Sequence, residues 1–98
     1  MTNNQRTICR KIVTHYGEKA QRRILIEECA ELIQAITKLE RAETAGKFGM
    51  EERSHLCEEI ADVMIMLEQI SSCYSWNMIS AYIDRKLERQ MKRMAEER

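Results

Sequence analysis

Proline is absent from this chain of 98 residues, and glycine occurs only three times. Because these two residue types form most tight turns, the chain has too few of them for a sheet of several strands. The sequence therefore predicts an all-α fold, in a single domain over residues 1–98. With 44% hydrophobic residues and long apolar helix faces, part of the burial is expected to come from a second subunit, in a homodimer or a homotetramer.

A net charge is also missing, because sixteen basic and sixteen acidic residues cancel. No overall field attracts a nucleic-acid polymer or an anionic membrane, so neither is expected as a partner. The longest apolar run, residues 63–67, is too short to cross a bilayer, and the polar start at residues 2–6 lacks a hydrophobic signal region. The four cysteines contain no CxxC pair and are expected to be reduced. We expect a cytoplasmic protein.

Hydrophobic periodicity predicts four helices, at residues 3–16, 18–43, 51–73 and 76–93. Gly17 separates the first two helices, and a loop at residues 44–50 ends the second. The third helix is apolar nearly all round, which is typical of a central helix covered on several sides. We therefore expect a four-helix, bundle-like protomer.

Two acidic signatures lie inside these apolar helices: Glu-Glu-Cys-Ala-Glu-Leu at residues 27–32 and Glu-Glu-Ile-Ala-Asp-Val at residues 58–63. Carboxylates three residues apart share a helix face. Asp62 is the only charged residue between Glu59 and Glu68, in an otherwise apolar segment. An uncompensated carboxylate there costs on the order of several kcal/mol or stays protonated, so a cation is expected beside it.

A hard divalent metal is one interpretation of this missing cation, since Mg²⁺ accepts oxygen ligands. The ligands would be four acids that lie on or beside the apolar faces: Glu28, Glu31, Glu59 and Asp62. The other interpretation is that Asp62 and Glu31 form buried ion pairs with Arg22, Arg23 or Lys86. Mn²⁺ would be bound by the same oxygen atoms and is a substitute for Mg²⁺.

The pair of signatures, EExxEL on one helix and EExxD on the next after a glycine-bearing loop, resembles the MazG-like all-α nucleoside triphosphate pyrophosphohydrolases. The similarity runs from Tyr16 through Gln21 and both signatures to the basic segment at residues 86–89. It implies Mg²⁺-dependent cleavage between the α and β phosphates of a nucleoside triphosphate, with dUTP and dCTP as candidate substrates. The products would be a nucleoside monophosphate and pyrophosphate.

The same resemblance implies a role for particular residues. Glu28, Glu31, Glu59 and Asp62 would bind the metal, and Glu27 or its neighbour Glu28 would orient the attacking water. The implied substrate contacts are Lys86, Arg89, Gln21 and Tyr16. These roles agree with the chemistry, because phosphoryl transfer mainly needs charge neutralised on the phosphate oxygens and a water held in line.

Three other hypotheses compete with the pyrophosphohydrolase interpretation. A ferritin-like di-iron site needs two Glu-x-x-His motifs, and only the one at Glu52 and His55 fits. A non-catalytic helical oligomer that binds a protein partner would explain the heptad-like spacing, although Asp62 is hard to place in such an interface. A chain that keeps the metal site and only binds nucleotide is also compatible with the sequence.

Overall fold

The structure is a computed structural model that describes residues 1–97, and in that part of the chain it contains four helices and no strand. The helices are α1 (Asn3–Tyr16), α2 (Glu18–Thr44), α3 (Met50–Ser71) and α4 (Trp76–Glu96). The all-α prediction with four helices is confirmed, and every helix ends within about three residues of its predicted boundary. None of the described helices is long and apolar enough to cross a membrane.

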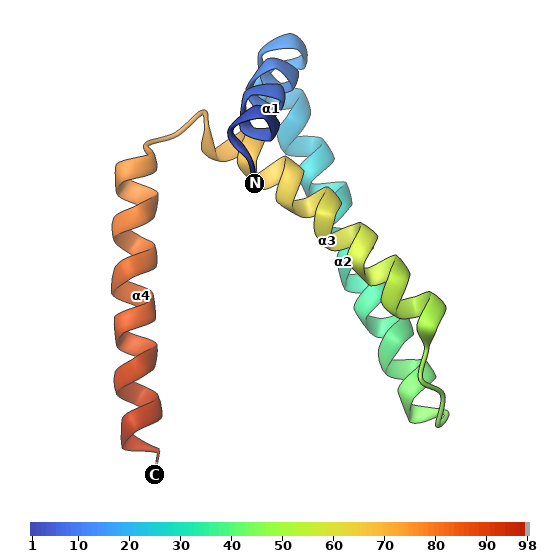
Figure 1. Cartoon of the computed structure of the whole chain (residues 1–98). Coiled ribbons are helices and arrows are strands. Elements are labelled where there is room, and N and C mark those ends of the chain that lie inside the picture. Colours follow the sequence, from blue (N-terminus) through green and yellow to red (C-terminus); the bar gives the residue numbers. More distant parts are fainter. Residues whose placement is uncertain (98) are drawn as a thin grey trace.

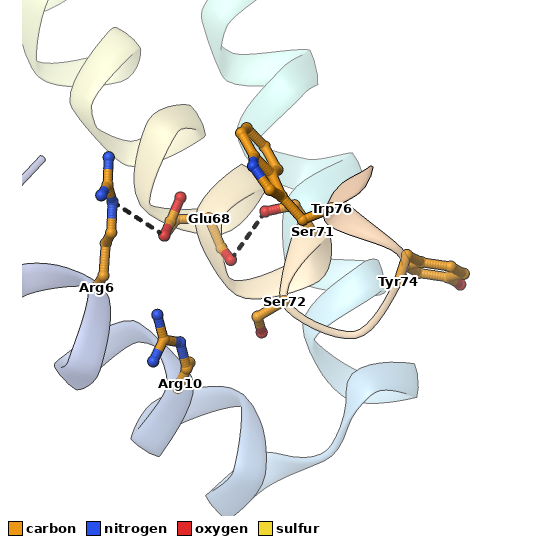
Figure 2. Close-up of a pocket in the computed structure, with 7 residues that line it drawn as sticks. All are labelled: Arg6, Arg10, Glu68, Ser71, Ser72, Tyr74 and Trp76. Atoms are coloured by element: carbon orange, nitrogen blue, oxygen red, sulfur yellow. Dashed lines mark hydrogen bonds and ion pairs between the residues drawn. The ribbon is translucent and has the colours of Figure 1, made fainter. Parts of the chain in front are cut away.

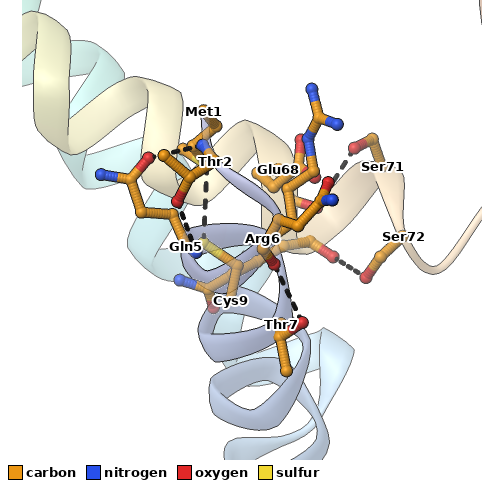
Figure 3. Close-up of polar contacts among 11 residues, drawn as sticks. Met1, Thr2, Gln5, Arg6, Thr7, Cys9, Glu68, Ser71 and Ser72 are labelled. Atoms are coloured by element: carbon orange, nitrogen blue, oxygen red, sulfur yellow. Dashed lines mark hydrogen bonds and ion pairs between the residues drawn. The ribbon is translucent and has the colours of Figure 1, made fainter.

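Local side-chain chemistry fixes the ends of α1. Thr2 Oγ1 accepts a hydrogen bond from the backbone N–H of Gln5 at 3.1 Å, and Gln5 Oε1 accepts one from the N–H of Thr2 at 2.8 Å (Figure 3). This reciprocal capping box satisfies two N–H groups that the helix cannot pair internally. Gly17 ends α1 with φ 92° and ψ 149°, a conformation open almost only to glycine, and the chain turns there into α2.

Helices α2 and α3 run antiparallel side by side, and α1 packs mainly against α3 (Figure 1). Arg53 stabilises the connection between α2 and α3, because it donates to the Phe48 carbonyl at 2.9 Å and pairs with Glu43 at 2.8 Å. At the other end of the pair, Gln21 Nε2 donates to Gln69 Oε1 at 2.8 Å in a buried contact. The two antiparallel helices are thus fixed at both ends.

The hydrophobic core of the single chain is small. Its buried apolar side chains come from α1, α2 and α3: Cys9, Val13, Ala35, Ala42, Val63 and Met66. Large apolar side chains on α2 and α3 remain open to solvent, with Ile26 69%, Ile33 64% and Leu67 51% exposed. A surface with this much exposed apolar area is typical of a face that a further chain covers.

Helix α4 stands apart from the other helices (Figure 1). It packs along none of the three other described helices, and none of its described residues is buried. The sequence predicts that its apolar stripe faces the inside of a bundle, but Ile83, Leu87 and Met91 are exposed. The packed unit of the chain is therefore α1 to α3, and within the described residues no other helix covers the apolar stripe of α4.

Candidate metal centre

Three carboxylates from α2 and α3 meet between the two antiparallel helices. One oxygen from each of Glu28, Glu59 and Asp62 lies within 4.8 Å of the other two. Glu59 and Asp62 are three residues apart on α3, so they point to the same side of that helix, and Glu28 faces them from α2. Helix packing therefore brings together residues from both acidic signatures.

These carboxylates are withdrawn from water, and no lysine or arginine among residues 1–97 pairs with them. Glu59 is only 5% exposed, and Glu28 and Asp62 are partly buried. Glu28 Oε2 and Glu59 Oε2 are buried and accept no hydrogen bond from the described residues. Buried polar atoms in native proteins are almost always hydrogen-bonded, so these two oxygens indicate a group that binds there.

Burial and mutual repulsion both act on the protonation of the cluster. Desolvation raises the pKa of Glu28, and the charges of Glu31, Asp62 and Glu59 raise it further. Desolvation is also the main cause that raises the pKa of Glu59, followed by the charges of Glu31 and Asp62. Glu31 itself is exposed, one turn of α2 beyond Glu28, and adds its charge from the rim of the cluster. Without a cation, the folded protein disfavours the ionised forms of Glu28 and Glu59.

One basic side chain of the protein lies beside the cluster. His55 Nε2 is 3.6 Å from Glu59 Oε1, and this contact lowers the pKa of Glu59 in opposition to the larger raising effects. Sequence reasoning gave His55 no role, although its spacing of four residues from Glu59 on one helix is the signal that finds it. His55 compensates a carboxylate charge only while it is protonated.

The alternative of buried ion pairs finds no support in the geometry. Among residues 1–97, no lysine or arginine forms an ion pair with Glu28, Glu59 or Asp62. Arg22 pairs instead with Glu18 at 3.5 Å, and Lys86 lies on the separate α4. The three clustered carboxylate oxygens fit a hard divalent cation. Two of the three residues, Glu28 and Glu59, also have a buried oxygen without a hydrogen-bond partner. No histidine belongs to this described cluster, which is unlike a di-iron site.

The remaining residues expected at the site lie outside the cluster. Glu27 is exposed next to Glu28 on α2. Gln21 is 7% exposed, about two turns of α2 before Glu28, with its amide bonded to Gln69. Tyr16 is exposed at the end of α1, with its ring against that of His15 at a centroid distance of 4.6 Å.

The two basic residues expected to contact substrate share one face of α4. Lys86 and Arg89 line a shallow hollow of about 270 Å³ together with Tyr82 and Arg85. Because α4 does not pack on α2 or α3, these side chains are not part of the carboxylate cluster of their own protomer. The carboxylates expected to bind metal and the two basic residues expected to contact substrate thus lie on separate structural units.

Partly buried carboxylates between two antiparallel helices, with no lysine or arginine of the described residues paired to them, are suited to hold a divalent cation. Among known families, residues 16–97 match the MazG nucleotide pyrophosphohydrolase domain. This match covers most of the chain, so the protein belongs to that family, and membership implies a nucleotide substrate and pyrophosphohydrolase activity. Neither the curated proteins nor the solved structures gave a match to the chain.

Proposed function

We propose that this protein, acting as one domain over residues 1–98, hydrolyses the bond between the α and β phosphates of a nucleoside triphosphate. The products are a nucleoside monophosphate and pyrophosphate. The observation that carries the proposal is the carboxylate cluster, in which Glu28 and Glu59 each keep a buried oxygen without a partner. In a chain of the MazG family, such a cluster suits Mg²⁺ with the phosphates of a nucleotide bound to it.

Four carboxylates would hold the cation in this proposal. Glu28, Glu59 and Asp62 have the required proximity, and Glu31 lies close enough to influence the pKa of Glu28 and Glu59. When bound, Mg²⁺, or Mn²⁺ in its place, supplies positive charge that offsets the charge on the phosphate oxygens. The acids of the protein then change from mutual repulsion to a shared attraction for one ion.

The other residues would position the nucleotide and the water. Glu27 or Glu28 would accept a proton from a water that attacks phosphorus in line with the α–β bridge, so that a new P–O bond forms as the bridge breaks and pyrophosphate leaves. Lys86 and Arg89 would contact phosphate oxygens, because their charges are free of ion pairs within the described chain. Tyr16 would contact the nucleoside, with dUTP and dCTP as the candidate substrates.

Assembly would bring the two halves of this site together. The exposed apolar stripe of α4 and the uncovered apolar face of α2 and α3 both need a covering surface. We propose that α4 of one subunit packs on α2 and α3 of another, in a homodimer or a homotetramer. Lys86 and Arg89 would then approach the carboxylates of a second subunit.

Turnover tests the proposal directly. Purified protein is incubated with Mg²⁺ and each nucleoside triphosphate in turn, and the products are separated. Wild-type protein is expected to release monophosphate and pyrophosphate from a subset of nucleotides. Glu59→Gln and Asp62→Asn are expected to lower this activity at least about 100-fold, since even the loss of an outer-shell partner of a metal typically costs about 10–100-fold.

Glu58→Gln is the matched control, because Glu58 is exposed and adjacent to Glu59. It is expected to keep wild-type activity, and circular dichroism should show the same helix content for all variants. Unchanged turnover in both cluster variants would refute the metal-site assignment. Nucleotide binding without turnover of any triphosphate would instead indicate the non-catalytic, nucleotide-binding alternative.

A further inference from the structure

A polar pocket lies away from the carboxylate cluster, where α1 meets the end of α3 and the start of α4 (Figure 2). Its volume is about 370 Å³, at the lower end of the range of about 300–1,000 Å³ typical of small-molecule sites. We refer to it as the arginine pocket, defined by the residues that carry the argument below: Arg6, Arg10, Glu68, Ser71, Ser72 and Trp76.

The charges of the arginine pocket are not balanced. Arg6 and Arg10 are four residues apart on α1, so their guanidinium groups share a face, an arrangement that by itself slightly destabilises a helix. Glu68 pairs with Arg6 at 3.5 Å, whereas Arg10 has no ion pair or side-chain hydrogen bond within residues 1–97. Figure 2 shows the Arg10 guanidinium turned towards the pocket beside Glu68. The pocket therefore holds one positive charge in excess, which favours an anion.

The other lining groups suit an anionic ligand that also carries hydrogen-bond donors and an aromatic ring. Ser71 Oγ and Ser72 Oγ donate to the carbonyls of Glu68 and Gln69 at 3.1 and 2.6 Å. Their hydroxyl protons are thus engaged, and their oxygens can accept hydrogen bonds from a ligand. Trp76 is 60% exposed at the rim and offers an aromatic face. Tyr74 points away from the arginines and donates to Glu18 at 3.2 Å, so Trp76 is the ring available for stacking (Figure 2).

We propose that the arginine pocket binds a nucleoside monophosphate. Arg10 and Arg6 would contact the phosphate, the serine oxygens would accept from sugar hydroxyls or base N–H groups, and the base would stack on Trp76. Charge-assisted hydrogen bonds from guanidinium groups and base stacking on an aromatic ring are the usual means of holding such a ligand. A single ring, sugar and phosphate also match the small volume.

This pocket is separate from the carboxylate cluster. Glu59 and Glu68 are nine residues apart on α3, which corresponds to about 900° of rotation and about 13 Å of rise. They therefore lie on opposite sides of α3, one towards α2 and the other towards α1. One nucleotide is too short to pass around the helix and occupy both places, so the inference holds whether or not the cluster is catalytic.

Intrinsic fluorescence tests the proposal, because Trp76 is the only tryptophan in the chain. The full-length protein is titrated with each ribonucleoside 5′-monophosphate in buffer with EDTA, which removes metal from the carboxylate cluster. At least one monophosphate is expected to change the Trp76 emission in a saturable way. Arg10→Gln is expected to weaken this binding about tenfold, through the loss of a charge-assisted hydrogen bond.

Three controls make the outcome decisive. Lys11→Gln removes a charge from the next residue of α1 and should bind like wild type, as should Glu59→Gln, which changes only the other site. Equal affinity for inorganic phosphate and for the monophosphates would overturn the nucleotide assignment. Equal affinity of wild type and Arg10→Gln, or no emission change with any monophosphate up to millimolar concentration, would overturn the site itself.

Discussion

Gln21 and Gln69 are joined by a buried hydrogen bond of 2.8 Å that links the beginning of α2 to the end of α3. Gln69 is 1% exposed, and its amide nitrogen also approaches Met66 Sδ at 3.5 Å. Both amides are thus engaged inside the protein. This placement favours a structural role for Gln21, in addition to the substrate contact that the family resemblance implies.

Removing one side of this bond is expected to destabilise the protein. Gln21→Ala leaves the buried Gln69 amide without its partner, which typically costs about 1–3 kcal/mol of unfolding free energy. Urea denaturation measures the change, with Gln34→Ala on the exposed side of α2 as the control. A stable Gln21→Ala protein with a strongly raised KM would contradict this expectation and would favour the substrate contact.

Neutralising one carboxylate of the cluster is expected to stabilise the metal-free protein. Glu28→Gln removes a charge that burial and three neighbouring carboxylates disfavour, so the Tm in EDTA should rise by a few degrees. Differential scanning calorimetry measures this, and Glu27→Gln at the exposed neighbouring position should change little. A lower Tm for Glu28→Gln would mean that its carboxylate makes a favourable contact instead. Added Mg²⁺ should stabilise wild type more than Glu28→Gln.

The same cluster predicts a pH dependence with a definite sign. Burial raises the pKa of both Glu28 and Glu59 in the folded protein, so protonation favours folding. Their contribution to stability is fully present below the ordinary glutamate pKa and is lost as the pH rises through the raised values. In EDTA, wild type and Glu28→Gln should therefore have similar Tm values at a pH below the ordinary glutamate pKa. As the pH rises through the raised pKa values, the Tm of wild type should fall below that of Glu28→Gln. A constant difference across that window would contradict the assignment.

Charge on the apolar stripe of α4 is expected to dissociate the oligomer. Leu87 is 61% exposed in the protomer, so Leu87→Glu costs little within a single chain but places a charge in the proposed interface. Light scattering after size-exclusion chromatography should show a smaller species than wild type. Lys92→Glu, on the polar side of α4, is the control and should leave the mass unchanged. A wild-type protein that is monomeric at all concentrations would refute the proposed assembly.

Sequence patterns were sufficient for the helices, and they predicted an acidic site of which Glu28, Glu59 and Asp62 lie close together in the structure. Gly17, the predicted break between the first two helices, lies between α1 and α2 with a positive φ, because a local signal determines this boundary. The placement of Asp62 among apolar residues indicated the cluster, because side-chain periodicity on a helix follows from its fixed geometry. These predictions depend only on residues close together in sequence or on one helix face.

Long-range packing could not be predicted in the same way. The apolar stripe of α4 shows that the helix needs a cover but not which chain supplies it. Gln69 is polar and is nevertheless only 1% exposed, because its side chain is hydrogen-bonded to Gln21. Since Gln21 lies 48 residues away in the sequence, no local pattern predicts this burial. The arginine pocket likewise depends on α1 packing against the end of α3, so the i, i+4 spacing of Arg6 and Arg10 alone carries little information.

The separation of α4 from the carboxylates has a consequence for how activity would depend on abundance. If the acidic and basic residues of a site meet only between subunits, then dilution below the dissociation constant of the oligomer separates the subunits and abolishes catalysis. Activity per molecule would rise steeply with the concentration of the protein and then level off. The level of expression would itself act as the switch, with no effector molecule needed.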